Sequence, residues 1–217
     1  MRGTCAAVLA SWVVCLLCVV HAYLCVRAKP VDICDSLPLM WYLDEESHTG
    51  DLVFFKRPDA GLLHRIVSPM THVAIVVMHP TSGEPWLVET HDDKAVRGHG
   101  AGVHAYPARP RLLEFKGELF VVRIQCPLSA ARVMRAVDGL RTVPYMSRGM
   151  HRYFATCKLL PEVGVCRPPG MVCSELVLHI LNQLGILTTA WHCATPSDVL
   201  HMAANSDSYV EPCRLTD

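Results

Sequence analysis

The chain has 217 residues, which is enough for one sizeable domain and an appendage. Its 20 lysines and arginines balance its 20 aspartates and glutamates, so the formal net charge at pH 7 is zero. The sequence has neither a positive net charge nor a basic block, and it therefore gives no support to a nucleic-acid-binding function. Hydrophobic residues make up 51% of the chain, and the first 28 residues raise that average.

Residues 5–26, CAAVLASWVVCLLCVVHAYLCV, form an apolar stretch with no acidic or basic residue other than His21. As a helix, this stretch would span about 30 Å, the thickness of the hydrocarbon core of a bilayer. It fits a retained anchor, with Arg27 and Lys29 on the cytoplasmic side, and it fits a cleaved signal peptide equally well. We therefore expect residues 1–28 to be a signal or membrane anchor, in a protein that is membrane-associated or enters the secretory pathway.

The cysteine count leaves the redox compartment open. Seven of the eleven cysteines follow the apolar stretch, and this odd number fits three disulfides with one thiol as well as a fully reduced protein. No CxxC pair occurs after residue 18, which disfavours a structural zinc site.

After the apolar stretch, the pattern predicts a linker over residues 29–47 and one α+β domain over residues 48–217. Strands come first and helices follow, which indicates a small antiparallel sheet packed against helices. A helix is predicted to begin after Ser129 as its N-cap, another to run from Cys173 to Leu184, and a short last one to follow Thr195. The predicted strands are LVFF within 48–58, HVAIVVM at 72–78, EPWLVET at 84–90, residues 102–106 and residues 118–125.

The motif GMVCSEL, residues 170–176, places Cys173 between a Pro-Pro-Gly turn and an amphipathic helix. A thiol at a helix N-terminus lies beside unpaired backbone N–H groups, which favour the thiolate and can also stabilise an oxyanion. Ser174 and Glu175 are expected to make contacts in the first turn. An inert core thiol is the alternative, because cysteine is among the most buried residue types.

A nucleophilic cysteine needs a base and a group that orients the base. His72 opens an apolar strand, where a polar side chain needs a partner. Glu89 lies in the next strand and can face His72 across the hairpin, holding one imidazole nitrogen and leaving the other for the thiol. His91 points to the same face and is an alternative third member. A strand-end histidine beside a solvated glutamate would explain the pattern without catalysis.

Histidines and aspartates also gather between residues 91 and 104. The segment contains His91, Asp92, Asp93, His99 and His104, which are types that bind metals. The surrounding sequence RGHGAG is rich in glycine, which favours a surface loop. We therefore expect no metal site.

Five motifs occur in chain order: GDLVFF (50–55), THVAIVV (71–77), LVET (87–90), VCSELV (172–177) and TPSDVL (195–200). They resemble the motifs of the circularly permuted papain-like proteins, the NlpC-type cysteine hydrolases in which histidine precedes cysteine. The resemblance is to the branch that includes bacterial lipoprotein-like members and a poxvirus protein, and it covers about residues 48–200.

The resemblance implies a permuted papain-like α+β core, with a small antiparallel sheet or barrel, and no cofactor. It assigns Cys173 as the nucleophile, His72 as the base and Glu89 as the orienting residue. The implied activity is that of a thiol-dependent hydrolase or acyltransferase that cleaves an amide or ester bond through an acyl-enzyme. Substrates carrying an acyl or amide group, lipids and lipoproteins among them, fit a membrane location, and a virus-encoded protein in a host cell is one setting.

A non-enzymatic papain-like binding scaffold, membrane-anchored or secreted and stabilised by disulfides, is the alternative function. A disulfide-stabilised protein of this kind would have Cys173 oxidised with a partner such as Cys166 or Cys193. Retention of Cys173, His72 and Glu89 together favours the enzyme, because a decayed site typically loses one of its polar residues.

Overall fold

The computed structural model describes residues 31, 33–61, 68–92, 100–146, 169–188 and 193–217. The chain divides into two compact units, Met1–Val31 and Asp32–Asp217, and the fold described here is that of the second. The expected signal or anchor at residues 1–28 lies outside the described residues. Within the described residues, no helix has both the length and the apolar character that a membrane span requires.

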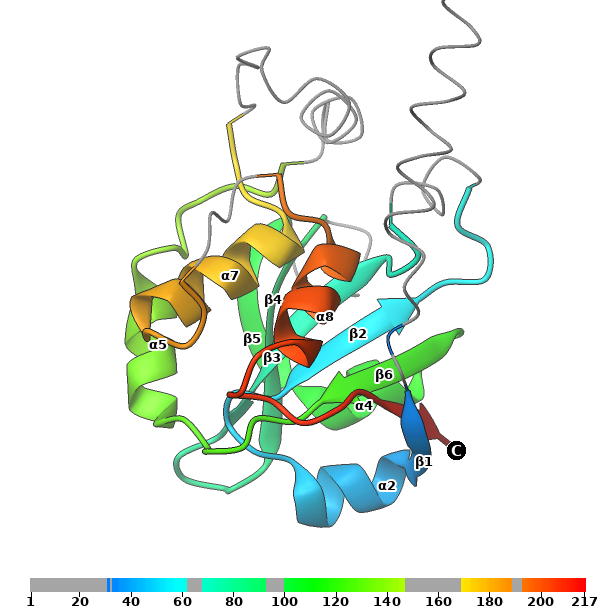
Figure 1. Cartoon of the computed structure of the whole chain (residues 1–217). Helices are drawn as coiled ribbons and strands as arrows, with labels where there is room; N and C mark the ends of the chain where they lie inside the picture. The colour runs from blue at the N-terminus through cyan, green and yellow to red at the C-terminus, as the bar shows by residue number, and fades with distance from the viewer. Residues whose placement is uncertain (1–30, 32, 62–67, 93–99, 147–168, 189–192) are drawn as a thin grey trace, which may run out of the picture. The chain divides into compact units, whose positions relative to one another are not determined.

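The second unit is an α+β fold built on an open sheet (Figure 1). Within the described residues the sheet has seven strands in the order β1-β7-β6-β2-β3-β4-β5. Neighbouring strands are antiparallel except for β1 and β7, which are parallel. The strands are β1 (Cys34–Pro38), β2 (Leu52–Lys56), β3 (His72–Met78), β4 (Pro85–His91), β5 (Gly102–Pro107), β6 (Glu118–Val122) and β7 (Cys213–Thr216).

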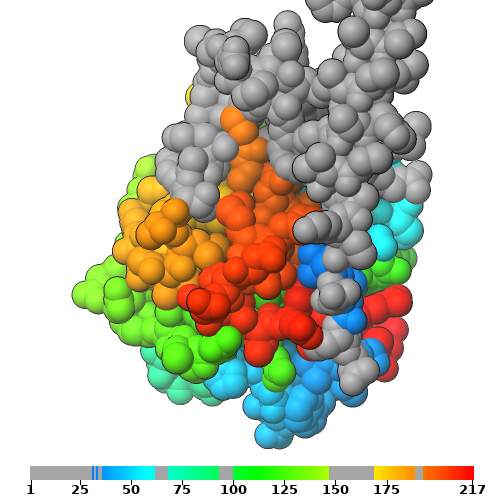
Figure 2. Space-filling view, viewed as in Figure 1, coloured from blue at the N-terminus to red at the C-terminus, as the bar shows by residue number. Residues whose placement is uncertain are grey.

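Helices pack on both faces of the sheet. The three longer ones, α5, α7 and α8, lie together on one side of it in Figure 1, and α7 packs on β3 and β4. The space-filling view of the same side shows α8 and the C-terminal segment in the middle, with α7 and α5 beside them (Figure 2). The described helices are α2 (Leu39–Trp41), the π-helix η1 (Tyr42–Glu46), α4 (Ala108–Leu113), α5 (Ala130–Asp138), α7 (Cys173–Gln183) and α8 (Pro196–Ala204).

The opposite face of the sheet forms a core with α2, η1 and α4. Alternate residues of the central strands, such as Phe55 of β2 and Val76 of β3, pack there against Tyr42 and Leu112. The residues between them, such as Ile75, are buried on the other face, where α7 packs on β3 and β4. The apolar run of β3 is therefore explained by burial on both faces, as its sequence predicts.

Most of the predicted elements are confirmed. The five strands from β2 to β6 and the helices α5, α7 and α8 lie where the sequence pattern places them, with boundaries that differ by a few residues. Gly185 follows α7 with a φ of +73°, the left-handed conformation expected just after a helix. The fold class α+β is also confirmed, although the sheet is open and does not close into a barrel.

The prediction that residues 29–47 are a linker is wrong for most of that stretch. Residues 34–46 form β1, α2 and η1, and Tyr42 is fully buried in the core. The Tyr42 hydroxyl donates a hydrogen bond of 3.1 Å to the Asp51 carboxylate. Since β1 pairs with β7, at the other end of the chain, its local sequence carries no pattern that identifies the partner.

Candidate active site

His72 is the first residue of β3, and the chain before it is anchored at two points. The backbone N–H and the hydroxyl of Thr71 both donate to the carbonyl of Phe55, at 2.7 and 2.9 Å. Near the start of α8, the hydroxyl oxygen of Ser197 accepts a hydrogen bond of 3.1 Å from the backbone N–H of Met70. These contacts fix the point at which β3 begins and therefore the position of the His72 imidazole.

Cys173 is the first residue of α7, and its neighbours hold the helix start in place. The Glu175 carboxylate accepts from the backbone N–H of Val172 at 3.4 Å, and the Ser174 hydroxyl donates to the Ala194 carbonyl at 2.5 Å. Ser174 and Glu175 are fully buried, and Cys173 is 6% exposed. The first-turn contacts expected for Ser174 and Glu175 are thus present, and they fix the backbone from which the thiol projects.

The structure brings the three predicted site residues together in one hydrogen-bonded chain. The Nε2 atom of His72 lies in hydrogen-bond contact with Oε2 of Glu89, and the Cys173 side chain hydrogen-bonds to the same imidazole. An ionised carboxylate can only accept, so Nε2–H donates and Nδ1 is left for the thiol. Glu89 is fully buried. The Cys173 side chain comes from α7, which packs on β3 and β4, and the Glu89 side chain comes from β4 itself.

The charges of the three groups support one another. Burial lowers the pKa of His72, but the charges and hydrogen bonds of Cys173 and Glu89 outweigh it and raise that pKa to about 10. Burial raises the pKa of Glu89, but His72 and then Arg111 lower it to about 2. The raised pKa of His72 and the lowered pKa of Glu89 favour an imidazolium paired with an ionised carboxylate at neutral pH.

Arg111 of α4 is a member of the site that sequence reasoning missed. Its Nε lies 3.2 Å from Oε1 of Glu89, the carboxylate oxygen that His72 does not use. Its guanidinium stacks over the Phe55 ring at 4.7 Å, and its side chain is 16% exposed. The one available signal was indirect: a carboxylate expected to bind His72 with one oxygen needs a donor for the other oxygen, and Arg111 is a basic residue in the chain that follows.

Tyr145 is the second missed neighbour of the thiol. It forms an isolated parallel bridge with Met171, whose N–H donates to the Pro144 carbonyl at 2.9 Å. Gly170, with a φ of +115°, permits this approach, because a Cβ there would lie 2.7 Å from the Pro144 oxygen. Burial, followed by the charge of Cys173, raises the pKa of the Tyr145 phenol, which therefore stays protonated at neutral pH.

His91 does not take the place of the third site residue. Its Nδ1–H donates to the carbonyl of Asp92 at 2.7 Å, and its ring stacks on that of His104 with 5.0 Å between the centroids. Burial lowers the pKa of His91, so it is neutral where His72 is charged. Within the described residues, no group of three histidines, cysteines or acids is placed to hold a metal ion, and Asp93 and His99 lie outside them.

The oxidation state of Cys173 distinguishes a free nucleophilic thiol from a cysteine held in a disulfide. Cys126, Cys173 and Cys213 are present as thiols, whereas Cys193 is disulfide-bonded. The expectation for a disulfide-stabilised protein, that Cys173 pairs with Cys166 or Cys193, is therefore wrong.

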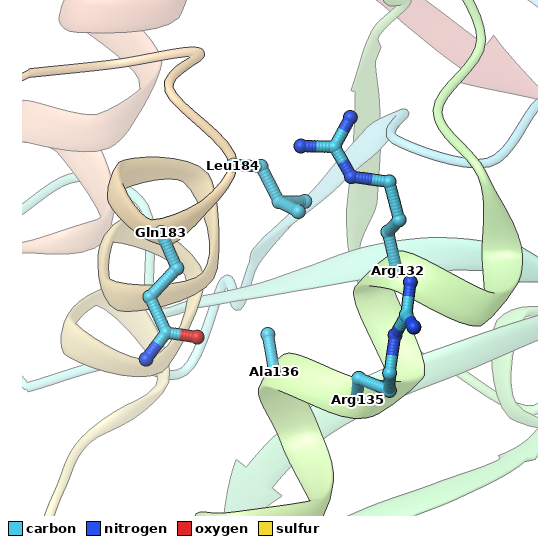
Figure 3. A pocket seen from close by; sticks show the side chains of 5 residues that line it. All are labelled: Arg132, Arg135, Ala136, Gln183 and Leu184. Atoms are coloured by element: carbon cyan, nitrogen blue, oxygen red, sulfur yellow. The ribbon is translucent and has the colours of Figure 1, made fainter.

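A shallow pocket of about 230 Å³ lies at the other end of α7, away from the thiol. Figure 3 shows Arg132 and Arg135 rising from α5 opposite Gln183 and Leu184. The 11 residues of α7 make a rod of about 16 Å, so this pocket is separate from the Cys173 site.

The arrangement at Cys173 contains the groups that acyl transfer by a cysteine nucleophile requires. They are a thiol group at a helix start, an imidazole that holds the thiol proton and a buried carboxylate that orients the imidazole. Comparison with known proteins assigns no family, since no family model matches the chain and no curated protein is significantly similar to it. The geometry of Cys173, His72 and Glu89 is thus the basis for assigning a function.

Proposed function

We propose that the protein is a thiol-dependent hydrolase or acyltransferase with a permuted papain-like fold. The observation that carries the proposal is the contact chain from Cys173 to His72 to Glu89. The three residues come from α7, β3 and β4, and all three side chains are buried or nearly so. A buried carboxylate bound to an imidazole that also contacts a thiol is costly to fold, and such arrangements are concentrated at functional sites.

The chain order supports the permuted papain-like assignment. In the sequence His72 and Glu89 precede Cys173, as in the family that the motifs resemble. In space the cysteine opens a helix, while the histidine and the acid lie on adjacent antiparallel strands. The same set of roles occurs on several unrelated folds, so the roles of the three residues carry more weight than the fold.

In the acylation step, the Cys173 sulfur attacks the carbonyl carbon of an ester or amide, and a carbon–sulfur bond forms. The thiol proton is held by His72, whose raised pKa favours the imidazolium form. The tetrahedral intermediate collapses when the bond to the leaving group breaks and the imidazolium gives its proton to that group. The product of this step is a thioester between Cys173 and the acyl group.

In the deacylation step, neutral His72 takes a proton from the acceptor, which is water in a hydrolase or an amine or hydroxyl group in an acyltransferase. The acceptor oxygen or nitrogen attacks the thioester, and the carbon–sulfur bond breaks. The thiolate is restored beside the imidazolium. Glu89 stays ionised throughout, because its role is to accept the hydrogen bond from Nε2–H and to stabilise the positive imidazole.

Two donors near the sulfur can stabilise the oxyanion. The first backbone N–H groups of a helix have no acceptor within the helix, and that of Cys173 lies next to the attacking atom. The protonated phenol of Tyr145, close enough to feel the charge of Cys173, is a second candidate. Both groups belong to segments that the Met171 and Ala194 contacts fix in place.

The proposed substrates, lipids or lipoproteins, are inferred from the membrane or secretory location that the N-terminal sequence supports. The uncharged stretch 5–26 supports a membrane-associated or secretory protein, and acyl bonds of lipids or lipoproteins are then within reach of the domain. The charge balance of the chain gives no support to a nucleic acid as a partner.

Acyl-enzyme formation tests the proposal directly. The purified full-length protein, in detergent micelles, is mixed with aryl esters of short and long fatty acids and with peptide amides, and the intact mass is followed. We expect one acyl group on Cys173 and at least a thousandfold loss of turnover in Cys173→Ala. Cys126→Ala, which removes an exposed thiol, is the matched control and should leave turnover unchanged. Equal turnover in Cys173→Ala and wild type would refute the proposal.

A further inference from the structure

The Glu89 carboxylate has a second partner besides the imidazole. Its Oε2 contacts His72, and its Oε1 accepts a hydrogen bond of 3.2 Å from Nε of Arg111. Glu89 is fully buried, so each of its oxygens needs a donor to replace the water lost on folding. Arg111 supplies the donor for Oε1, the oxygen that His72 does not bind.

The guanidinium of Arg111 is itself held in place. It lies over the Phe55 ring at 4.7 Å and within 5.7 Å of the Phe115 ring centroid, and the two rings meet edge to face at 5.0 Å. Phe55 also contacts the His72 ring, with 5.3 Å between the centroids. A cation stacked on aromatic rings has a fixed orientation, unlike a solvated arginine side chain.

The space that Phe115 occupies depends on Gly117. A Cβ at Gly117 would lie 2.6 Å from the Phe115 ring and 2.5 Å from the carbonyl oxygen of Lys56. The turn between α4 and β6 is therefore shaped to bring Phe115 onto the guanidinium. The aromatic support of Arg111 is built by the fold around it.

Among the residues that the structure describes, several charged or titratable groups lie near the Glu89 carboxylate, and Arg111 is the one of these with a permanent positive charge. His104 is directly opposite Glu89 in the register of β4 with β5, but its Nε2 bonds to the Gly100 carbonyl at 2.7 Å. The groups near the carboxylate are His72 of β3, His91 of β4, His104 of β5 and Arg111 of α4, while Cys173 of α7 contacts His72 and Tyr106 of β5 contacts His91.

We propose that Arg111 is a positioning residue that fixes the Glu89 carboxylate, and through it the His72 imidazole, for reaction at Cys173. With one cation on each oxygen, the carboxylate can neither rotate away from His72 nor take the imidazole proton. The proposal deepens the function given above and rests on it, but the contact between Arg111 and Glu89 can be tested without turnover.

Two measurements on the full-length protein test the role of Arg111. One is the titration of the Glu89 carboxyl carbon by ¹³C NMR, assigned by its loss in Glu89→Gln. The other is the rate of Cys173 alkylation by iodoacetamide from pH 5 to pH 9. A role confined to overall folding would move neither value in a protein that remains folded.

In Arg111→Gln we expect the pKa of Glu89 to rise by about one unit or more and the alkylation rate at pH 7 to fall about tenfold to hundredfold. Arg111→Lys keeps the charge without the fixed geometry of the guanidinium, so the pKa of Glu89 should stay low while alkylation slows about threefold to tenfold. Arg109→Gln is the matched control, because Arg109 lies on the same helix and forms an exposed ion pair with Asp44. It should change neither value.

A folded Arg111→Gln protein with an unchanged Glu89 pKa and an alkylation rate within twofold of wild type overturns the inference. If Arg111→Gln does not fold, Arg111→Lys decides, and a rate within twofold of wild type then overturns it. The proposed function fails separately, when the wild-type protein forms no acyl-enzyme with any substrate although Arg111→Gln still shifts the pKa of Glu89 and slows alkylation.

Discussion

The hydroxyl of Ser174 donates a buried hydrogen bond of 2.5 Å to the carbonyl of Ala194. This contact joins the first turn of α7, which carries Cys173, to the segment that leads into α8. Thr195 then caps α8, accepting from the Asp198 N–H, while the start of α8 holds the chain before His72 through Ser197. The thiol and the imidazole are thus positioned by a common anchor, although they lie about a hundred residues apart in the chain.

Ser174→Ala should weaken this anchor. The Ala194 carbonyl loses a buried donor, and we expect the free energy of unfolding to fall by about 1–2 kcal/mol and acylation of Cys173 to slow severalfold. Urea unfolding and the rate of acyl-enzyme formation measure the two effects. Ser129→Ala is the control, because Ser129 precedes α5 without a side-chain cap bond and should have little effect. A Ser174→Ala protein with wild-type stability would contradict the role of this contact.

Asp51→Ala should be strongly destabilising without changing the site chemistry. The buried carboxylate accepts from the Ile124 N–H and the His48 N–H, both at 2.9 Å, and from the Tyr42 hydroxyl. Three donors would lose their acceptor, and we expect a loss of about 3 kcal/mol in the free energy of unfolding, measured by denaturant titration.

The control for Asp51 is Asp59→Ala, which breaks an exposed ion pair with Arg57. Its effect should stay below about 1 kcal/mol. Similar effects of the two substitutions would show that the Asp51 contacts do not stabilise the start of β2.

The charged His72 should make stability depend on pH in the alkaline range. The pKa of His72 is raised in the folded state from 6.5 to about 10, so its contribution is complete below pH 6.5 and is lost as the pH rises through about 10. The stability difference between wild type and His72→Gln should therefore be constant from pH 5 to pH 6.5 and shrink from there to pH 10. Urea unfolding of both proteins across this range measures it, and an equal difference at pH 6 and pH 9.5 would contradict the shift.

Glu89 should act in the opposite direction at acidic pH. Its pKa is lowered in the folded state from 4.5 to about 2, so its contribution is present above pH 4.5 and is lost as the pH falls through about 2. The stability difference between wild type and Glu89→Gln should therefore decline below pH 4.5. The same unfolding experiment, extended to acid, measures it, and a difference that grows on acidification would be inconsistent with an ionised Glu89.

Gly170→Ala should disturb the approach of Tyr145 to Cys173. An alanine at a φ of +115° is strained, and its Cβ would meet the Pro144 oxygen at 2.7 Å. We expect a loss of about 2–3 kcal/mol in stability and slower acylation of Cys173. Gly139→Ala, at a position with open space and ordinary backbone angles, is the control and should be close to neutral. Thermal melts and acylation rates of both variants make the comparison.

The local patterns of the sequence were sufficient to predict the central strands and the helix that begins at Cys173. Each of these elements buries particular faces: β3 is apolar throughout, β4 alternates, and the helix that begins at Cys173 is amphipathic. Apolar residues therefore recur at a spacing that is visible in the sequence. The pairing of His72 with Glu89 was predictable for the same reason, because adjacent strands of a hairpin place such residues on one face.

The tertiary structure alone decided which groups complete the site. Arg111 reaches Glu89 from a six-residue helix whose sequence, ARPRLL, shows little helical periodicity. Tyr145 is held beside the segment before Cys173 by a single bridge to Met171. The choice of Glu89 over His91 depends on a hydrogen bond of His91 to its neighbour's carbonyl. The sequence by itself thus determined the strands, the helices and the residue types able to react, since these depend on local periodicity. Their partners depend on contacts between distant segments, which only packing brings together.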